Sequence, residues 1–286
     1  MGRLIISLAA LIPVVIFCWY IYSKDKQEKE PIGLLTLLFL VGAVSYFPAI
    51  LAENSLIGVT DKIFSGSIEY SLTGFKTFKT ESTFVFYSLI SAFFAIALTE
   101  EIMKWVLLYF ITHKNKNFDH LFDGVIYATF LSLGFAAAEN IFYAIRDGWG
   151  VFILRSLTSL PSQMTFGVLM GFFYTMWKIF SIAVDKEKSL ENQGMIKIKR
   201  PFNTKIWLVL CIIVPVILHG CYAFFNYFAS TIMTIIFYAF VILLYVICFV
   251  GVRWFSELDC EGESVAERMV SKKYSSLNKR EKSKEK

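Results

Sequence analysis

Long uninterrupted runs of apolar residues are the feature that most constrains the fold of this chain. A helix that crosses a bilayer needs about 20 mainly apolar residues, and several runs meet that length. They predict an all-α, polytopic integral membrane protein with about seven transmembrane helices. The predicted spans are residues 4–23, 32–52, 83–112, 123–145, 152–184, 205–227 and 231–252.

The composition agrees with a membrane domain and a short polar tail. Apolar residues make up 56% of the 286 residues and charged residues 18%, whereas soluble domains contain about 25% charged residues. The first run is longer than the apolar region of a signal peptide and lacks a small-x-small cleavage site, so it is read as a span. We therefore expect one membrane domain, 1–252, and a basic tail, 253–286, that is disordered or loosely helical. The polar stretch 53–82 has room for a short surface helix.

The positions of lysine and arginine predict the orientation of the chain. They collect at 24–29, 114–116, 186–205 and in the tail. With seven spans, all four regions fall on one side, which the positive-inside rule makes cytoplasmic. We expect a multi-pass protein of the cell membrane with its N-terminus outside and its C-terminus in the cytoplasm. Basic flanks of this kind explain the net charge of +5, so the lipid bilayer is an expected partner and nucleic acid is not.

Two adjacent acids, Glu100 and Glu101, lie deep in the third span. An ionised side chain at mid-helix costs about 2.5–3.5 kcal/mol, so such residues face a cavity or a partner and mark function. Neighbouring residues differ by about 100° around a helix. One carboxylate can therefore face a cavity while the other meets a neighbouring helix. Lys104 lies within contact range of both acids. This arrangement suits a general base; an ion-paired trio that only packs is the alternative.

The fourth span carries a second intramembrane polar pair, Glu139 and Asn140, and Glu139 is assigned to middle depth. Glu139 fits either catalysis or an interhelical hydrogen bond. Asp123 opens the same span, where an acidic residue favourably meets the helix dipole and by itself says little.

The fifth and sixth spans add three polar residues. Arg155 lies near the outer surface, where its side chain can extend toward water. Gln163 follows within the apolar stretch and alone would indicate an interhelical hydrogen bond. His219 is the one histidine at membrane depth under this assignment. A lone histidine is usually a satisfied core residue, but the two acids of the third span make a site equally reasonable.

Four sequence elements in order resemble those of the PrsW-type intramembrane proteases. The run EEIMKW resembles their E-E-x-x-K element, and the fourth span resembles F-D-G-x-x-Y followed by G-F-A-x-x-E-N. The segment from Arg155 through PSQMTFG resembles R…P-x-H-x-x-F-G, and HGCY resembles H-G-x-Y. These elements spread over residues 100–225. The family is distantly akin to the CAAX prenyl endopeptidases.

The resemblance implies a glutamate-dependent membrane peptidase that cleaves a single-span membrane protein, such as an anti-sigma factor, at the first step of regulated intramembrane proteolysis. Carried over by motif, Glu100 or Glu101 would activate water and His219 would assist. Glu139, Asn140, Asp123, Lys104 and Arg155 would shape or support the site.

One position departs from the family pattern. Gln163 stands where the motif has a histidine, and a glutamine can donate a hydrogen bond but cannot shuttle a proton. The residue is consistent with a natural variant, a pseudo-enzyme or an inactivating replacement. A catalytic zinc usually has three protein ligands; with one histidine left at membrane depth, we expect no cofactor and disfavour zinc.

Two other classes of function stay open at this stage. A catalytically silent protein of the same fold would bind a partner's membrane segment, and Gln163 favours that interpretation. An ion or proton transporter would show repeat symmetry or paired broken helices. The sequence shows no internal repeat, so we rank the transporter last.

Overall fold

The computed structural model describes residues 2–70, 76–198 and 201–282. Within them the chain is almost entirely helical. The elements in chain order are α1 (Gly2–Lys24), α2 (Ile32–Ile63), the 3₁₀ turn η1 (Ser65–Ser67), β1 (Ile68–Tyr70), β2 (Lys76–Phe78), α3 (Glu81–Ile90), the π-helical segment η2 (Ser91–Ala97), α4 (Leu98–Thr112), α5 (Asp123–Asp147), α6 (Trp149–Leu157), α7 (Ser159–Asn192), α8 (Lys205–Phe225), α9 (Thr231–Glu257) and α10 (Gly262–Lys282).

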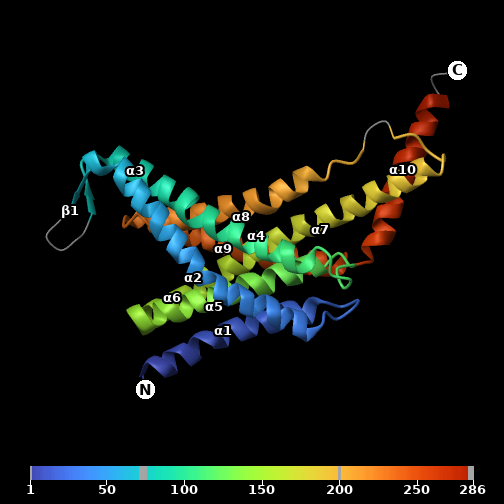
Figure 1. Cartoon of the computed structure of the whole chain (residues 1–286). Helices are drawn as coiled ribbons and strands as arrows, with labels where there is room; N and C mark the ends of the chain where they lie inside the picture. Colours follow the sequence, from blue (N-terminus) through green and yellow to red (C-terminus); the bar gives the residue numbers. More distant parts are fainter. Residues whose placement is uncertain (1, 71–75, 199–200, 283–286) are drawn as a thin grey trace.

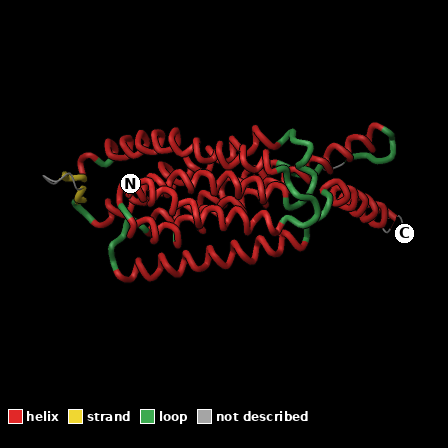
Figure 2. The backbone as a smooth tube through the Cα atoms, turned by 90° about the horizontal axis from the view of Figure 1, so that it is seen from below, coloured by secondary structure: helices red, strands yellow, loops and turns green. Residues whose placement is uncertain are grey.

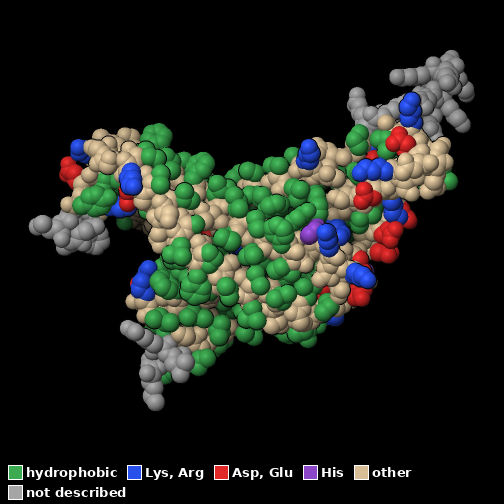
Figure 3. Space-filling model, viewed as in Figure 1, with side chains coloured by type: hydrophobic (Ala, Val, Ile, Leu, Met, Phe, Trp, Pro, Cys, Tyr) green, Lys and Arg blue, Asp and Glu red, His purple; other side chains and the backbone are tan. Residues whose placement is uncertain are grey.

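Seven helical segments in the described chain are long and apolar enough to cross a membrane. The third runs from α3 through η2 to α4, and the fifth joins α6 to α7. Figure 2 shows the helices lying side by side along one common direction. On the face drawn in Figure 3, hydrophobic side chains cover the middle and charged ones gather toward the two ends. The predicted all-α polytopic membrane fold is therefore confirmed.

The bundle has two distinct ends, which we name by what they carry (Figure 1). The hairpin end holds the N-terminus, α6 and the short β1–β2 hairpin. The α10 end holds the turn between α1 and α2, the loop between α4 and α5, and the C-terminal helix. Because the membrane helices alternate in direction, α5 and α8 both run from the α10 end to the hairpin end.

Helices α2, α5 and α7 approach one another through glycines. A Cβ on Gly134 of α5 would lie 2.0 Å from the carbonyl oxygen of Phe39 in α2. One on Gly171 of α7 would lie 2.2 Å from the carbonyl oxygen of Gly124 in α5. Small residues of this kind let membrane helices pack backbone against backbone. Helix α5 lies in the middle of this trio and is the most buried of the seven segments.

The structure corrects the expected polar stretch at 53–82. Helix α2 continues through it to Ile63, and the hairpin follows in place of a surface helix. Lys76 of β2 is within 2.7 Å of Asp61, which also accepts a hydrogen bond from Tyr87 of α3. These bonds attach the hairpin to α2 and α3, so residues 53–63 belong to the bundle.

The tail takes the helical one of its two expected forms. Helix α9 continues past the expected boundary at 252 to Glu257, and most of the remaining described tail forms α10. Ala266 and Val270 of α10 are buried against Ile179 and Ala183 of α7. A narrow apolar stripe on an otherwise polar helix is enough to dock α10 on the extension of α7. The fifth span is likewise longer than expected and breaks at Thr158, between α6 and α7.

Candidate active site

Lys104 holds both adjacent glutamates in the interior of the bundle. The Lys104 side chain is 0% exposed, and its Nζ donates to Glu101 Oε1 at 2.8 Å and to Glu100 Oε2 at 3.3 Å. Spacings of three and four residues on α4 allow both bonds at once. One ammonium group therefore serves two carboxyl groups in an environment where an unpaired charge is costly.

Gln163 of α7 completes the coordination of Lys104. Its Oε1 accepts the third Lys104 hydrogen bond at 2.6 Å, and its Nε2 donates to Glu100 Oε2 at 3.1 Å. An ammonium group has three donors, and all three are used here. Gln163 is buried and lies behind Glu100, outside the lining of the cavity described below. The glutamine thus orients Glu100 and Lys104 rather than facing the cavity.

The backbone before Glu100 departs from a regular α-helix. In η2 the N–H of Leu98 bonds to the carbonyl oxygen of Phe93. A π-helical turn holds an extra residue and rotates the residues after it, and such turns often occur at functional sites. Gly220 of α8 packs against this turn, since a Cβ there would lie 2.4 Å from the Phe93 ring. The missing side chain lets His219 approach α4.

His219 approaches the same two carboxylate oxygens as Lys104. Its Nδ1 lies 2.9 Å from Glu101 Oε1 and 3.8 Å from Glu100 Oε2. The imidazole stacks on Phe166 with 4.9 Å between ring centroids. An ionised carboxylate accepts only, so Glu101 selects the form of His219 that carries a proton on Nδ1. Glu101 itself is fully buried, which makes it an orienting group for the imidazole.

Arg155 turns inward and does not extend along the surface as the sequence suggested. Its guanidinium lies 2.7 Å from Glu139 Oε1 and donates to Asn140 and Ser159. It also sits over the Tyr143 ring, 4.0 Å from the centroid. The break between α6 and α7 places Arg155 so that it can reach α5. Glu139 is thereby balanced by its own cation, separate from Lys104.

A partly open cavity of about 350 Å³ connects these groups. It lies toward the hairpin end, where α5 and α8 finish. Five helical elements contribute charged side chains or tyrosines to its lining: Glu53, Glu100, Glu139, Tyr143, Arg155, His219 and Tyr222. Glu101, Lys104, Gln163 and Asn140 stand behind this lining. The neighbouring acids of α4 thus differ in exposure, with Glu100 at the cavity and Glu101 behind it.

Glu53 of α2 is a cavity residue that the sequence analysis did not single out. It is half-buried and lies next to Glu100. It follows the last apolar residue of the second predicted span, so it was counted as part of a connecting stretch. The continuation of α2 to Ile63 could have been suspected only from the apolar residues that recur between Leu56 and Ile63.

Asp123 lies apart from this cluster, contrary to the expected supporting role. It begins α5 at the α10 end, 16 positions before Glu139, or roughly 24 Å along a helix. Its Oδ2 accepts the backbone N–H groups of Asp119 and His120. Asp123 therefore fixes the loop that precedes α5.

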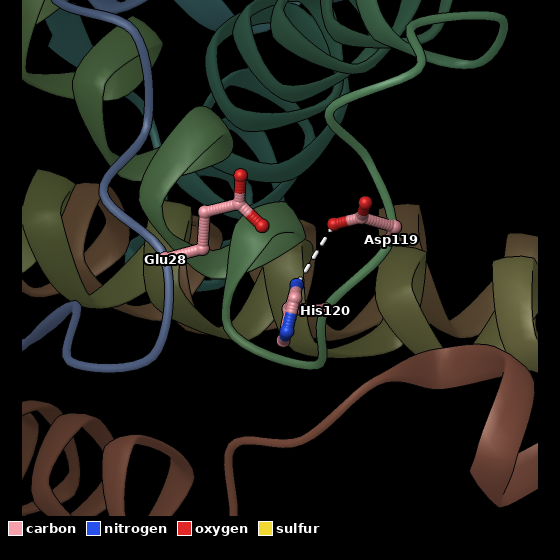
Figure 4. A group of neighbouring side chains, drawn as sticks. All are labelled: Glu28, Asp119 and His120. Atoms are coloured by element: carbon pink, nitrogen blue, oxygen red, sulfur yellow. Dashed lines mark hydrogen bonds and ion pairs between the residues drawn. The ribbon is translucent and has the colours of Figure 1, made fainter.

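A second cluster of titratable side chains lies at that loop (Figure 4). Glu28, Asp119 and His120 bring ligand atoms within 4.8 Å of one another. His120 Nδ1 lies 2.8 Å from Asp119 Oδ1. Partial burial opposes charge on the ring, but the hydrogen bond with Asp119 outweighs it and raises the pKa of His120. Glu28 and Asp119 are exposed, as solvated surface acids commonly are.

The acids and the histidine of the cavity have some features of a metal site. Glu100, Glu101 and His219 offer ligand atoms within 4.8 Å of one another, and Glu101 Oε2 is buried without a described partner. A divalent ion between the carboxylates would, however, lie against the fully buried ammonium of Lys104. Two like unit charges 4 Å apart repel by about 4 kcal/mol at an effective dielectric constant of 20. The arrangement fits a lysine between two carboxyl groups better than a metal ion.

Comparison with known proteins identifies the family. A family model described as PrsW family intramembrane metalloprotease matches residues 30–252. The chain belongs to the PrsW family of intramembrane proteases. Protease PrsW of Oceanobacillus iheyensis is 32% identical over 239 residues, covering 84% of this chain and 90% of that protein. Protease PrsW of Bacillus subtilis is 27% identical over 216 residues, covering 76% and 80%. No solved structure matches the chain.

The matched region contains the whole PrsW cavity, from Glu53 to Phe237. The resemblance noted from the motifs is therefore confirmed, and with it a membrane-embedded protease. The family description includes the word metalloprotease, whereas in this structure the ammonium group of Lys104 occupies the space between the two carboxyl groups. The conflict concerns the chemistry of hydrolysis and leaves the family assignment intact.

Proposed function

We propose that this PrsW protein cleaves a peptide bond of a single-span membrane protein with Glu100 as the general base. The observation that carries the proposal is the position of Glu100 and His219. Both line the cavity, whereas Glu101 and Lys104 lie behind it. Water that enters the cavity can thus reach Glu100, and the other buried groups keep that carboxylate oriented.

The chemistry is acid–base hydrolysis. Glu100 takes a proton from water, and the water oxygen attacks the carbonyl carbon of the substrate. The Glu101 carboxylate orients His219, whose ring lines the cavity and assists the reaction, and polar groups that face the cavity stabilise the oxyanion that forms. General-base catalysis contributes about 10²–10⁴-fold, and oxyanion stabilisation a comparable factor. Lys104 and Gln163 act by holding Glu100 in place.

No metal ion takes part in this proposal. The Lys104 ammonium supplies the positive charge next to the two carboxyl groups that a divalent ion would otherwise supply. The reaction is then expected to be insensitive to chelators.

The substrate class follows from the resemblance and from the position of the cavity. The described parts of the predicted cytoplasmic segments 24–29, 114–116 and 186–205, rich in lysine and arginine, lie at the α10 end. The cavity lies toward the opposite end, which would then face outward. A single-span partner such as an anti-sigma factor would be cut in or near the outer half of its membrane segment, the first cut of regulated intramembrane proteolysis.

The test is cleavage in cells that lack their own relative. The chain would be co-expressed with a panel of single-span membrane proteins carrying tags on both sides, and cleavage read by immunoblot. Glu100→Gln and Glu101→Gln should abolish cleavage at unchanged protein level. Glu69→Gln is the matched control, because Glu69 lies in the exposed hairpin. Cleavage by both core variants at the wild-type rate would remove the glutamate mechanism.

A catalytically silent binding protein is the second candidate, and Gln163 favours it. If the family histidine is needed for the chemistry, this chain binds the same substrates without cutting them. Restoring the histidine by Gln163→His separates the two. Cleavage that appears only in the variant supports the silent binder, whereas cleavage by the wild-type chain supports the active protease.

A further inference from the structure

Glu53 is the one acid of the cavity wall that lies outside the motif-bearing region 100–225. It comes from α2, while the other acids come from α4 and α5. It faces the same cavity as Glu100, Glu139 and His219. Its carboxyl group interacts with those of Glu100 and Glu139 and lies within hydrogen-bonding reach of Glu100.

The charges around the cavity do not balance without a proton. Besides tyrosine hydroxyls, the charged groups facing Glu53 from the surrounding helices are Glu100, Lys104, Glu139, Arg155 and His219. With Glu101 there are four carboxyl groups against two permanent cations. Lys104 uses all three donors on Glu100, Glu101 and Gln163.

Glu53 is therefore the acid left without a cation. Arg155 pairs with Glu139, and no ion pair to Glu53 occurs in the described part of the chain. Two carboxyl groups that share a small cavity cannot both ionise easily, because like charges in a shared site favour keeping one proton between them.

We propose that Glu53 is a further catalytic residue, the general acid that shares a proton with Glu100 and delivers it to the departing amine. This assignment rests on the proposed function of Glu100 as general base. The two carboxyl groups come from different helices and face one space, so both can reach the reacting atoms of a peptide bond held in the cavity.

The proton passes through both carboxyl groups in one turnover. Glu100 takes one proton from water as the water oxygen bonds to the carbonyl carbon. As the carbon–nitrogen bond breaks, the nitrogen takes the proton of Glu53, which becomes a carboxylate. The new acid and amine leave, and the proton on Glu100 returns to the shared position between the two carboxyl groups. Water is consumed and no other reactant is required.

The first experiment measures cleavage of the panel member that the wild-type protein cuts, with full-length protein in liposomes. Glu53→Gln keeps the size of the side chain and removes its proton. We expect kcat to fall by about 10²–10⁴-fold, the usual contribution of general acid–base catalysis, with KM little changed. The alkaline limb of the pH–rate profile should disappear, and Glu53→Asp should restore part of the rate.

The kinetic constants of Glu53→Gln decide whether Glu53 is the general acid. A kcat loss below about tenfold for Glu53→Gln, under the range of general acid catalysis, overturns the assignment. A rise in KM with kcat and the pH profile unchanged also overturns it, because that pattern reports binding alone. The Glu69→Gln control should match the wild type. If Glu100→Gln remains active, the proposed function fails; if Glu100→Gln is dead and Glu53→Gln active, only the role of Glu53 fails.

A second measurement is independent of any substrate. Infrared difference spectra of the full-length protein, recorded across pH, report protonated carboxyl groups through their carbonyl stretch. A shared proton predicts one band that is lost or shifted in both Glu53→Gln and Glu100→Gln, and kept in Glu69→Gln. A band that changes in neither core variant, or in only one of them, contradicts the shared proton.

Discussion

Removing the charge of Lys104 should destabilise the protein strongly. Lys104→Met keeps a long, flexible side chain in the same space but leaves Glu100, Glu101 and Gln163 without their common donor. Breaking a buried ion pair by removing one partner costs about 3–5 kcal/mol, because the remaining charge is buried unpaired. We expect a loss in that range, limited at the upper end by protonation of a carboxylate. The assay is the free energy of unfolding in mixed detergent micelles.

The double variant provides the internal check. Lys104→Met with Glu101→Gln removes one charge of each sign, so it should recover about half of the loss or more. Lys186→Met is the matched control: Lys186 pairs with Glu263 and Glu267 at the surface, where such pairs contribute about 0–1 kcal/mol. A single variant within about 1 kcal/mol of the wild type, or a double variant no more stable than the single, would refute the reasoning.

Three further predictions concern pH, packing and metal. Burial raises the pKa of Glu30 to about 7 from the 4.5 of a free glutamate. Between these two values the carboxyl group keeps its proton in the folded protein and loses it in the unfolded chain. The free energy of unfolding should therefore fall as pH rises from about 4.5 to about 7. Glu30→Gln should flatten that part of the unfolding profile, and an equal fall in both proteins would contradict it. Gly171→Ala should lower the free energy of unfolding by about 1–3 kcal/mol or more from overpacking, because its Cβ would lie 2.2 Å from a backbone oxygen. Gly58→Ala on α2 is the control and should not destabilise the protein, since its Cβ would meet nothing within 4 Å. Equal stability of the two variants would refute the close contact at Gly171. Chelators should leave cleavage unchanged, and a loss that zinc restores would show that a metal is needed.

The sequence predicted the parts of the site that depend on local geometry. Lys104 lies three and four residues from the two acids, so their contact follows from helix spacing alone, and the structure has both bonds. The angle between adjacent helical residues likewise anticipated that one carboxyl group faces a cavity while the other lies behind it. The number of spans followed from run length.

Features that depend on helix order or on helix ends could not be obtained in this way. Glu53 reaches the cavity because α2 continues past its apolar run and lies beside α4. Arg155 turns inward because α6 and α7 meet at a break. Asp123 shares a motif with Glu139 but lies at the other end of the same helix. Shared sequence motifs indicate that a chain belongs to a family. Distance along a helix decides which of the motif residues can lie in one site.

The glycine contacts of α2, α5 and α7 have a mechanical consequence. Where backbone touches backbone there is no layer of side chains to rearrange, so these three helices behave as one stiff block. Glu53 and Glu139 belong to the block, whereas Glu100 and His219 lie on α4 and α8, which pack on its outside and contact each other and the irregular turn η2. We expect any widening that admits a polypeptide to come from displacement of α4 and α8, which would separate Glu100 from Glu53 and Glu139.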